Sequence, residues 1–366
     1  MDRREFLSGT AAIAVAVNCP KLASAEFRFP LQPGAWERFE ISTLVEIASP
    51  QGEVHAWVPL PSVNEKDWIK VIDSSWTSNG NAEMARDPHY GAEMLHVQWD
   101  AEQKAPTVEV TSTVLTCDRA VDFSQPDNAG MALSAAEREL NTAGTELIPT
   151  DGIVKQTSDK IVTGKRTDLD RARAIYDWVV GNTFRDPKAR GCGVGDVASM
   201  LKAGNLGGKC ADLNALFVGL VRAAGIPARD IYGIRAAPSK FGYKSLGVSS
   251  EVITKAQHCR AEVYLDDYGW IAADPADVRK VVLEEPPGEL AIDNPKVVAA
   301  RDMLFGGWEG NWLAYNTAHD VALPGSAGPK LGFLMYPEAE CGNSRLDCLN
   351  SDNFKYTIRA KEVSRA

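Results

Sequence analysis

The sequence predicts an α+β protein in which an antiparallel β-sandwich precedes a domain of mixed helices and strands. Between residues 38 and 117, apolar and polar residues alternate in short runs separated by turn residues, as in half-buried strands. From residue 134 onward helical periodicity takes over, and strand-like runs return at 231–234 and 257–274. Strands that come first and are followed by a mixture of helices and strands are typical of α+β proteins.

Length and composition limit the classes of protein that fit. The chain has 366 residues, with 45% hydrophobic and 24% charged residues, as in an ordinary globular protein. Its length is too great for one compact core and indicates two or more domains or layers. A net charge of −10 and the lack of a basic tract argue against a nucleic-acid partner.

The first 25 residues have the pattern of a signal peptide. The segment Met1–Leu7 is followed by the apolar run 11–17 and by a small-residue cleavage site, Ala23-Ser24-Ala25. Paired arginines, Arg3 and Arg4, are similar to a twin-arginine export signal, although Asp2 replaces the usual Ser or Thr. We therefore expect a periplasmic or secreted bacterial protein. An ordinary secretory signal or a retained short anchor are the alternatives. The remaining sequence has no apolar run that could cross a bilayer.

Residues 26–120 are predicted to form the N-terminal β-sandwich domain. Several runs alternate between apolar and polar residues, namely 39–47, 54–58, 95–99 and 108–110. Short strands at this density favour an antiparallel sandwich. Its three histidines, His55, His89 and His96, have no metal-ligand spacing and are interpreted as packing or surface residues.

A helical bridge is expected over residues 121–165, with helices at 134–140 and 151–162. The next helix, 169–180, is amphipathic, and Ile175 and Trp178 lie on the face predicted to pack on the core. A glycine-rich stretch and a short helix at 197–202 then lead to the main helix of the domain.

That main helix begins with a cysteine directly after a flexible Gly207-Gly208 turn. Its apolar residues recur at helical spacing, and they are Leu213, Leu216, Phe217, Leu220, Val221 and Ala224. Gly225 and Pro227 mark the end. Cys210 therefore lies in the first turn, where unpaired backbone N–H groups and the helix dipole favour the thiolate. Lys209 adds a positive charge next to it, so Cys210 is the candidate nucleophile.

The segment 257–275 is predicted to be a hairpin of two short strands. His258 opens the first strand and Asp274 closes the second, and the open ends of a hairpin lie side by side. An imidazole and a carboxylate could therefore meet there. With Cys210 they would supply a nucleophile, a general base and a group that orients the base.

A regular ladder does not bring these two side chains together. With a plain four-residue loop, Leu265 would pair with Trp270 and Ala261 with Asp274, leaving His258 roughly 10 Å up the strand. A bulge, another loop closure or strong twist would have to close this gap. In the plain register Asp277 would lie opposite His258, so Asp277 is the reserve candidate for the orienting carboxylate.

Three motifs together resemble the core of the bacterial transglutaminase-like superfamily, and they span roughly residues 165 to 280. They are Gly-Gly-Lys-Cys-Ala-Asp at 207–212, His258 before Glu262-Val263-Tyr264, and Gly-Trp-Ile-Ala-Ala-Asp-Pro at 269–275. The resemblance implies a papain-like fold with thiol acyl chemistry. It implies Cys210 as the nucleophile, His258 as the general base and acid, and Asp274 as the orienting group. The catalytic core would then cover residues 166–285, and residues 286–366 would be an extension packed on it.

The sequence gives weaker support for a functional role of other polar residues near these motifs. Asn205 is a candidate oxyanion donor beside the backbone N–H of Cys210, but a role in forming a turn is favoured. In the loop 237–255, Tyr243 and Lys244 are interpreted as solvent-facing residues rather than substrate contacts. His319 is a distant competitor of His258, because no strand or Asp-Pro return follows it.

Cysteine spacing gives no support for a metal site, and no cofactor is expected. Cys19 should leave with the signal peptide. Six cysteines remain, Cys117, Cys192, Cys210, Cys259, Cys341 and Cys348. An exported protein could oxidise Cys341 and Cys348 to a small disulfide, and a Cys192–Cys259 bridge has less support. Buried free thiols are the alternative for both pairs.

These features predict an exported cysteine-dependent amide or peptide hydrolase with a protein or peptide substrate. Two alternatives stay open. One is a protein-glutamine acyl transferase that crosslinks with the same three residues, and the other is a non-catalytic binding module of the same fold. The sequence leaves the oligomeric state undecided.

Overall fold

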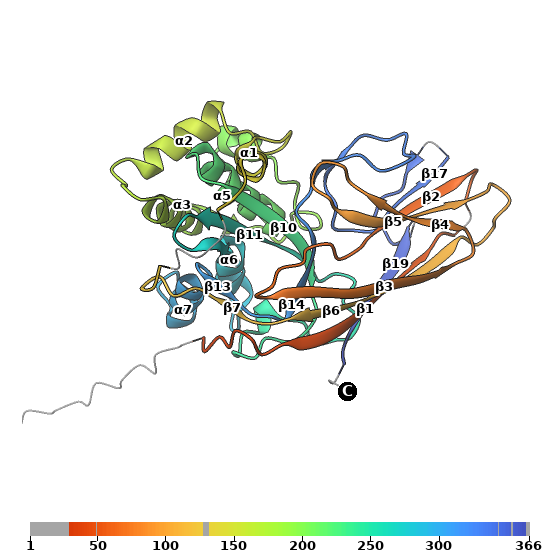
Figure 1. Ribbon diagram of the computed structural model, residues 1–366, viewed down its shortest axis with the longest axis horizontal. Helices are drawn as coiled ribbons and strands as arrows, with labels where there is room; N and C mark the ends of the chain where they lie inside the picture. The colour runs from red at the N-terminus through yellow and green to blue at the C-terminus, as the bar shows by residue number, and fades with distance from the viewer. Residues whose placement is uncertain (1–28, 49, 127–131, 343, 353, 364–366) are drawn as a thin grey trace, which may run out of the picture.

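A computed structural model describes residues 29–363 of the chain, apart from residues 49, 127–131, 343 and 353. The predicted signal peptide, with Arg3, Arg4 and Cys19, lies outside the described residues. Figure 1 shows a helical lobe beside a lobe made of strands. No helix in the described part of the chain has the length and apolar character needed to span a bilayer. The predicted α+β organisation is confirmed.

The strand lobe is a sandwich of two antiparallel sheets. The first sheet has the order β19-β1-β6-β3, with β1 (Glu37–Glu46), β3 (Ile69–Ser78), β6 (Thr107–Thr116) and β19 (Lys355–Glu362). The second has the order β18-β17-β2-β5-β4, with β2 (Val54–Pro59), β4 (Asn81–Arg86), β5 (Glu93–Trp99), β17 (Glu338–Cys341) and β18 (Ser344–Arg345). Alternate residues of β1, such as Val45, point inward and meet Val54 and Val97 of the second sheet.

The C-terminal residues do not form an extension on the catalytic core alone, as residues 286–366 were expected to do. Strand β19 pairs with β1 along its length, and β17 pairs with β2. The sandwich is therefore built from both ends of the chain. The alternation in these strands is short, and half of β19 is exposed, so the sequence pattern in this region is weak.

The helical lobe surrounds one buried helix, α5 (Cys210–Ala223). All of its residues are buried, and it packs on strands β10 and β11. The other helices are α1 (Ala135–Thr142), α2 (Gly152–Val162), α3 (Asp168–Asn182), α4 (Val197–Ala203), α6 (Pro275–Glu284) and α7 (Pro295–Met303). Helix α1 starts with a capping box between Ser134 and Glu137, which satisfies two backbone donors at its end.

The central sheet of this lobe has the order β12-β11-β10-β14. Its strands are β10 (Ala228–Arg235), β11 (Gln257–Leu265), β12 (Gly269–Ala273) and β14 (Trp312–Asn316). Short pairs complete the lobe, with β7 (Arg119–Ala120) on β13 (Gly307–Trp308) and β8 (Phe184–Arg185) parallel to β9 (Gly207–Gly208). A third pair, β15 (His319–Val321) on β16 (Leu331–Phe333), shares a buried cluster with Trp57 and Met94 of the sandwich. One 3-10 turn, η1, covers Lys244–Leu246.

Tryptophans join the two lobes. Trp68, from the loop before β3, stacks on Trp312 of β14 with ring centroids 6.0 Å apart and meets Trp308 edge-on at 5.2 Å. The Arg119 guanidinium lies 5.1 Å from the Trp308 ring and pairs with buried Glu262 of β11. One continuous apolar core therefore runs from the first sheet of the sandwich into the helical lobe.

Because β19 completes the sandwich, a buried residue of this strand should support the whole fold. Ile358 is 1% exposed and pairs with Thr43 of β1. We expect Ile358→Ala to lower the free energy of unfolding by about 2–4 kcal/mol, as other buried Ile-to-Ala truncations do. Urea unfolding measures this change. The matched control is Lys361→Ala, at an exposed position of the same strand, which should have an effect within about 0.5 kcal/mol. Equal, small effects of both variants would contradict this role of β19.

Candidate active site

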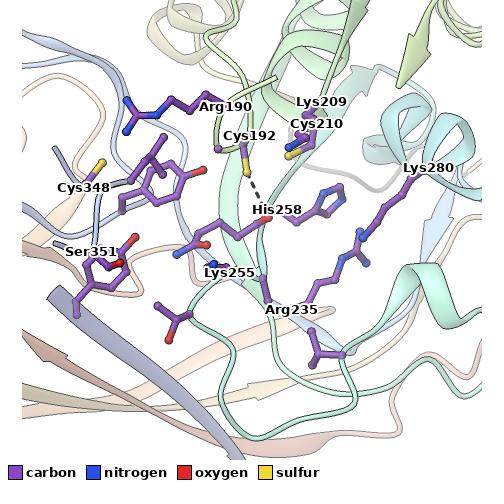
Figure 2. Close-up of a pocket in the computed structure, with 18 of the residues that line it drawn as sticks. Arg190, Cys192, Lys209, Cys210, Arg235, Lys255, His258, Lys280, Cys348 and Ser351 are labelled. Carbon is purple, nitrogen blue, oxygen red and sulfur yellow. Dashed lines mark hydrogen bonds between the residues drawn. The ribbon is translucent and has the colours of Figure 1, made fainter. Parts of the chain in front are cut away.

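The thiol of Cys210 lies at the N-terminus of α5 and faces a cleft. Figure 2 shows Cys210 and Lys209 at the start of this helix, across from His258. Cys210 is only 3% exposed, and the cleft in front of it has a volume of about 540 Å³. The cleft lies between the lobes, because Tyr336, Phe354 and Tyr356 from the C-terminal segment form part of its wall.

A carboxylate within α5 holds the glycine-rich approach to Cys210. Asp212 Oδ1 accepts the backbone N–H groups of Val194 and Gly195, each at 2.9 Å, and its Oδ2 accepts that of Lys209 at 2.9 Å. Gly193 has a φ of +96° and passes so close that a Cβ would lie 1.8 Å from Asp212 Oδ2. Only glycine fits there, so the loop and the helix start are fixed together.

The hairpin that carries His258 has a different register from the plain one. Its loop has three residues, and Leu265 pairs with Gly269, so Ala261 faces Ala273 instead of Asp274. Strand β12 then ends, and Asp274 becomes the N-cap of α6, where its Oδ1 accepts the backbone N–H of Asp277 at 3.0 Å. The different loop closure therefore brings Asp274 one residue closer to His258 than the plain register does, and the strand-to-helix turn, not a bulge, closes the remaining distance.

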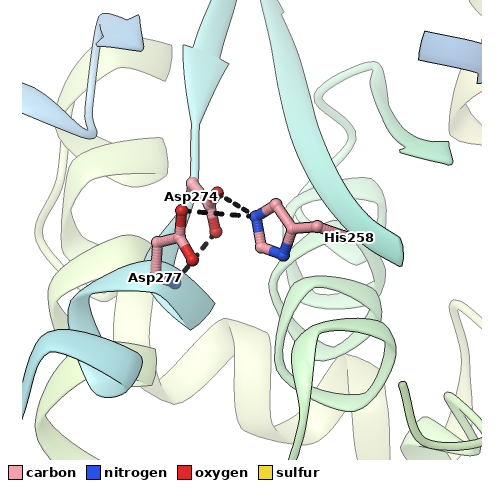
Figure 3. A group of neighbouring side chains, drawn as sticks. All are labelled: His258, Asp274 and Asp277. Atoms are coloured by element: carbon pink, nitrogen blue, oxygen red, sulfur yellow. Dashed lines mark hydrogen bonds and ion pairs between the residues drawn. The ribbon is translucent and has the colours of Figure 1, made fainter. Parts of the chain in front are cut away.

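Both candidate carboxylates meet the same imidazole nitrogen. Asp274 Oδ2 lies 2.8 Å from His258 Nε2, and Asp277 Oδ2 lies 3.3 Å from it, as Figure 3 shows. These aspartates are three residues apart at the start of α6, and helical geometry puts such residues on one face. With Nε2 occupied, Nδ1 of His258 is the ring nitrogen left for Cys210.

The buried charges around His258 set its protonation. Burial and the Arg235 guanidinium act to lower the pKa of His258, but Asp277 and Asp274 outweigh them and raise this pKa to about 9. Burial also opposes ionisation of Asp277, yet Arg235, at 2.5 Å, and His258 hold the pKa of this carboxyl well below its usual range. Burial and the charge on Asp277 raise the pKa of Asp274.

Two further thiols lie against the candidate nucleophile. Contact with Cys192 and then with Cys259 lowers the pKa of Cys210 well below the ordinary thiol value, and the hydrogen bond and charge of His258 lower it further, against the effect of burial. The Cys192 thiol itself donates to the Gln257 carbonyl at 3.3 Å. Cys210 and burial raise the pKa of Cys192 well above that value, and burial and Cys210 do the same for Cys259, so both thiols remain protonated. The arrangement favours a Cys210 thiolate beside a His258 imidazolium.

An asparagine from α5 locks the elements of the site together. Asn214 Nδ2 donates to the backbone carbonyl of Cys259 at 2.7 Å and to Asp274 Oδ1 at 3.3 Å, and its Oδ1 accepts the N–H of Ala276 at 3.2 Å. It thereby connects α5, β11 and α6. Sequence reasoning missed Asn214, although its position one turn after Cys210 was a usable signal.

Several other residues differ from the sequence interpretation. Asn205 is exposed, accepts the N–H of Gly207 at 3.2 Å and does not line the cleft, so it makes the turn that was its alternative role. Tyr243 is buried and donates to the Lys296 carbonyl at 2.8 Å, whereas Lys244 is exposed. The expectation that Tyr243 faces solvent is wrong, because its ring belongs to the main core and stacks on Phe29 at 4.5 Å.

The remaining histidines and cysteines have structural surroundings. His319 is buried and does not line the cleft. Its Nδ1 atom lies 3.3 Å from the hydroxyl oxygen of Tyr232. The rings of His55 and His96 stack beside Trp57 and share a hydrogen bond of 3.0 Å, which fits the packing role expected for them. The expected Cys341–Cys348 disulfide does not form, since both are free thiols, as are Cys192 and Cys259.

His258, Asp274 and Asp277 are also close enough to hold a metal ion. Their chemistry fits this role poorly. Asp277 already pairs with Arg235 at 2.5 Å, and Asp274 lies 3.8 Å from Arg260, so a metal cation would add to two buried guanidinium charges. The carboxylates of Asp274 and Asp277 suit an imidazolium instead, because they neutralise the positive charge of His258.

Comparison with known proteins bears on this site. A family model described as transglutaminase-like superfamily matches residues 155–275, which include Cys210, His258 and Asp274. An uncharacterized protein of Haemophilus influenzae is 34% identical over 96% of this chain and 99% of its own length. A crystal structure of a Cytophaga hutchinsonii protein, provisionally described as a cysteine protease, covers 92% of this chain and 93% of its own, with 14% identity and a TM-score of 0.57. The last likeness concerns the fold, and it confirms the predicted architecture of the core.

The contact between Gly193 and Asp212 is testable through the reactivity of Cys210. We expect Gly193→Ala to displace Asp212 and slow alkylation of Cys210 by iodoacetamide roughly tenfold or more, because small shifts of a reacting group are costly. The matched control is Gly181→Ala, in α3, where an added Cβ meets nothing within 4 Å. Mass spectrometry of the labelled peptide gives both rates. If the two variants react equally fast, Asp212 does not position the nucleophile.

Proposed function

The chain belongs to the transglutaminase-like superfamily, and we propose that it is a cysteine-dependent amide or peptide hydrolase that acts through Cys210, His258 and Asp274. The observation that carries the proposal is the ring nitrogen of His258 held by two carboxylates beside a thiol at a helix N-terminus. A buried acid–base pair with opposed pKa shifts is typical of catalytic sites.

In this mechanism the Cys210 thiolate attacks the carbonyl carbon of the substrate amide and forms an S–C bond. Charge that develops on the carbonyl oxygen meets the positive end of α5, where the backbone N–H of Cys210 can donate to it. His258 gives its proton to the amide nitrogen as the C–N bond breaks, and the amine leaves. Water then loses a proton to His258 and attacks the thioester, which releases a carboxylic acid and the Cys210 thiolate.

The two carboxylates have separate tasks in this proposal. Asp274 orients the imidazole through its bond of 2.8 Å to Nε2, and Asn214 fixes Asp274 in turn. Asp277 stays ionised beside Arg235 and helps to keep His258 protonated between turnovers. Asp277 is thus a positioning residue and not only a reserve for Asp274.

Hydrolysis is favoured over transfer to an amine because water can enter the cleft. Exposed side chains such as Arg190 and Lys255 line it, and transfer would require water to be excluded from the thioester. The N-terminal sequence pattern supports a periplasmic or secreted site of action, with a peptide or protein as substrate.

The rates of amide hydrolysis and of Cys210 alkylation should depend differently on pH at high pH. Above about 9, His258 loses its proton and can no longer supply it to the leaving amine, so amide hydrolysis should decline. Alkylation of Cys210 should not decline there, because it requires only the thiolate. In Asp274→Asn the pKa of His258 should fall, and the decline of hydrolysis should begin at a lower pH. Two results would contradict the role of His258 as proton donor. One is that hydrolysis and alkylation depend on pH in the same way, and the other is that hydrolysis by Asp274→Asn declines at the same pH as in the unmodified protein.

Hydrolysis itself is tested with a proteome-derived peptide mixture incubated in H₂¹⁸O with added cadaverine. We expect new C-termini that carry ¹⁸O, no cadaverine adducts, and complete loss of cleavage in Cys210→Ser. His258→Ala should reduce cleavage by about 10²–10⁴-fold. Cadaverine adducts in place of ¹⁸O would indicate acyl transfer. An unchanged peptide mixture would favour a non-catalytic binding module.

A further inference from the structure

The cleft at Cys210 is positively charged although the protein is acidic. The chain has a net charge of −10, yet six cationic side chains line the cleft: Arg185, Arg190, Lys209, Arg235, Lys255 and Lys280. Among the described residues that line it, none is an aspartate or glutamate. Figure 2 shows Arg190, Lys255 and Lys280 on different sides of the space in front of Cys210 and His258. A cleft that is lined by charges of one sign and has walls of low dielectric constant concentrates ligands of the opposite charge.

The protein's own carboxylates only partly neutralise this charge. Arg235 pairs with Asp277, and Arg190 pairs with Asp347. Glu284 is shared, since it pairs with Arg185 and lies 3.8 Å from Lys280. Lys209 and Lys255 have no ion-pair partner in the described part of the chain. Three carboxylates against six cations leave an excess of three positive charges.

Lys280 shows that these cations crowd one another. Its side chain is 18% exposed and extends from α6, one turn after Asp277. Burial, followed by the positive charge of Arg235, lowers the pKa of Lys280 to about 8, and Arg185 acts in the same direction. Such like-charge crowding is unfavourable, and a bound anion would relieve it.

The cleft also contains an unused hydrogen-bond donor. Gln257 precedes His258 and is 9% exposed, and its side-chain Nε2 is buried with no hydrogen-bond partner among the described residues. Because an unpaired buried donor is costly, a ligand with a carboxylate or carbonyl oxygen would satisfy it. This donor points to the same ligand chemistry as the cations do, independently of charge.

We propose that the cleft selects acidic peptides, in which a carboxylate lies within one or two residues of the amide attacked by Cys210. The proposal rests on the proposed hydrolase and adds its substrate class. Lys209 directly precedes the nucleophile, so the anionic group binds close to the reacting carbon. The volume of about 540 Å³ and the aromatic wall of Tyr336, Phe354 and Tyr356 fit a peptide rather than a small inorganic anion.

The first test measures the charge preference at the thiol itself, with two alkylating agents of similar size. Iodoacetate is an anion and iodoacetamide is neutral, and glutathione serves as the reference thiol. We expect the iodoacetate-to-iodoacetamide rate ratio at Cys210 to exceed that of glutathione about tenfold and to fall in high salt. A ratio at or below that of glutathione, unchanged by salt, would overturn the proposal.

Variants connect this ratio to the cleft. We expect Lys255→Gln and Lys280→Gln each to lower the ratio about two- to fivefold. Lys255 is exposed, so its loss should leave the fold intact even if Lys280→Gln is less stable. The matched control is Lys104→Gln, in the exposed turn between β5 and β6, which should leave the ratio unchanged. Equal effects of Lys104→Gln and Lys255→Gln would mean that only the net charge matters and would overturn the proposal.

A second test uses peptides as ligands. N-acetyl-triglutamate should protect Cys210 from iodoacetamide at concentrations at least about tenfold lower than N-acetyl-triglutamine amide requires, and Lys255→Gln should reduce this difference. Equal protection by both peptides would contradict the proposal.

These outcomes are separate from those of the proposed function. If Cys210 prefers anions but has the pH profile of an ordinary thiol, the cleft binds acidic peptides without the hydrolase chemistry.

Discussion

The rest of the site depends on the contact of His258 with Asp274 and Asp277. An imidazolium is costly to bury, and two carboxylates within 3.3 Å of one ring nitrogen compensate for the loss of water. They come from the first turn of α6, so the end of β12 must become a helix directly at Asp274. Asn214 and the buried surface of α5 then fix the distance between this turn and Cys210. The reactivity of the Cys210 thiol therefore depends on three elements that meet at one place, namely the β11–β12 hairpin and the N-termini of α5 and α6.

The same constraint explains the excess of buried cations nearby. Two adjacent carboxylates repel each other unless they are neutralised, and Arg235 lies 2.5 Å from Asp277 while Arg260 lies 3.8 Å from Asp274. The Arg260 guanidinium in turn lies over the rings of Trp308 and Trp312, which also join the helical lobe to the sandwich. Arg235 lines the cleft as well, so the charge that steadies Asp277 also contributes to the field that a substrate meets. Charge balance, lobe packing and the proposed substrate preference are therefore connected.

Local patterns were sufficient to predict that a helix begins at Cys210 and that His258 lies on a hairpin. Each depends on residues close in sequence: a periodic apolar face, a glycine turn before the helix, and a glycine and a proline at its end. The hairpin register was not predictable, because it depends on whether the loop holds three or four residues and on where α6 begins. The C-terminal strands were assigned to the wrong part of the fold, since the pairing of β19 with β1 joins the two ends of the chain. Roles such as those of Asn214, Gln257 and Lys280 required the fold, because their partners are distant in sequence.

The central claim is that Cys210 and His258 form a thiolate–imidazolium pair, and thiolate absorbance at 240 nm tests it most directly. The spectrum of Cys210→Ser is subtracted from that of the unmodified protein across the pH range. The account predicts a Cys210 thiolate signal well below the pH at which an ordinary thiol ionises, and its loss in His258→Ala. A signal that appears only at the pH of an ordinary thiol, and that is the same in His258→Ala, would contradict the account.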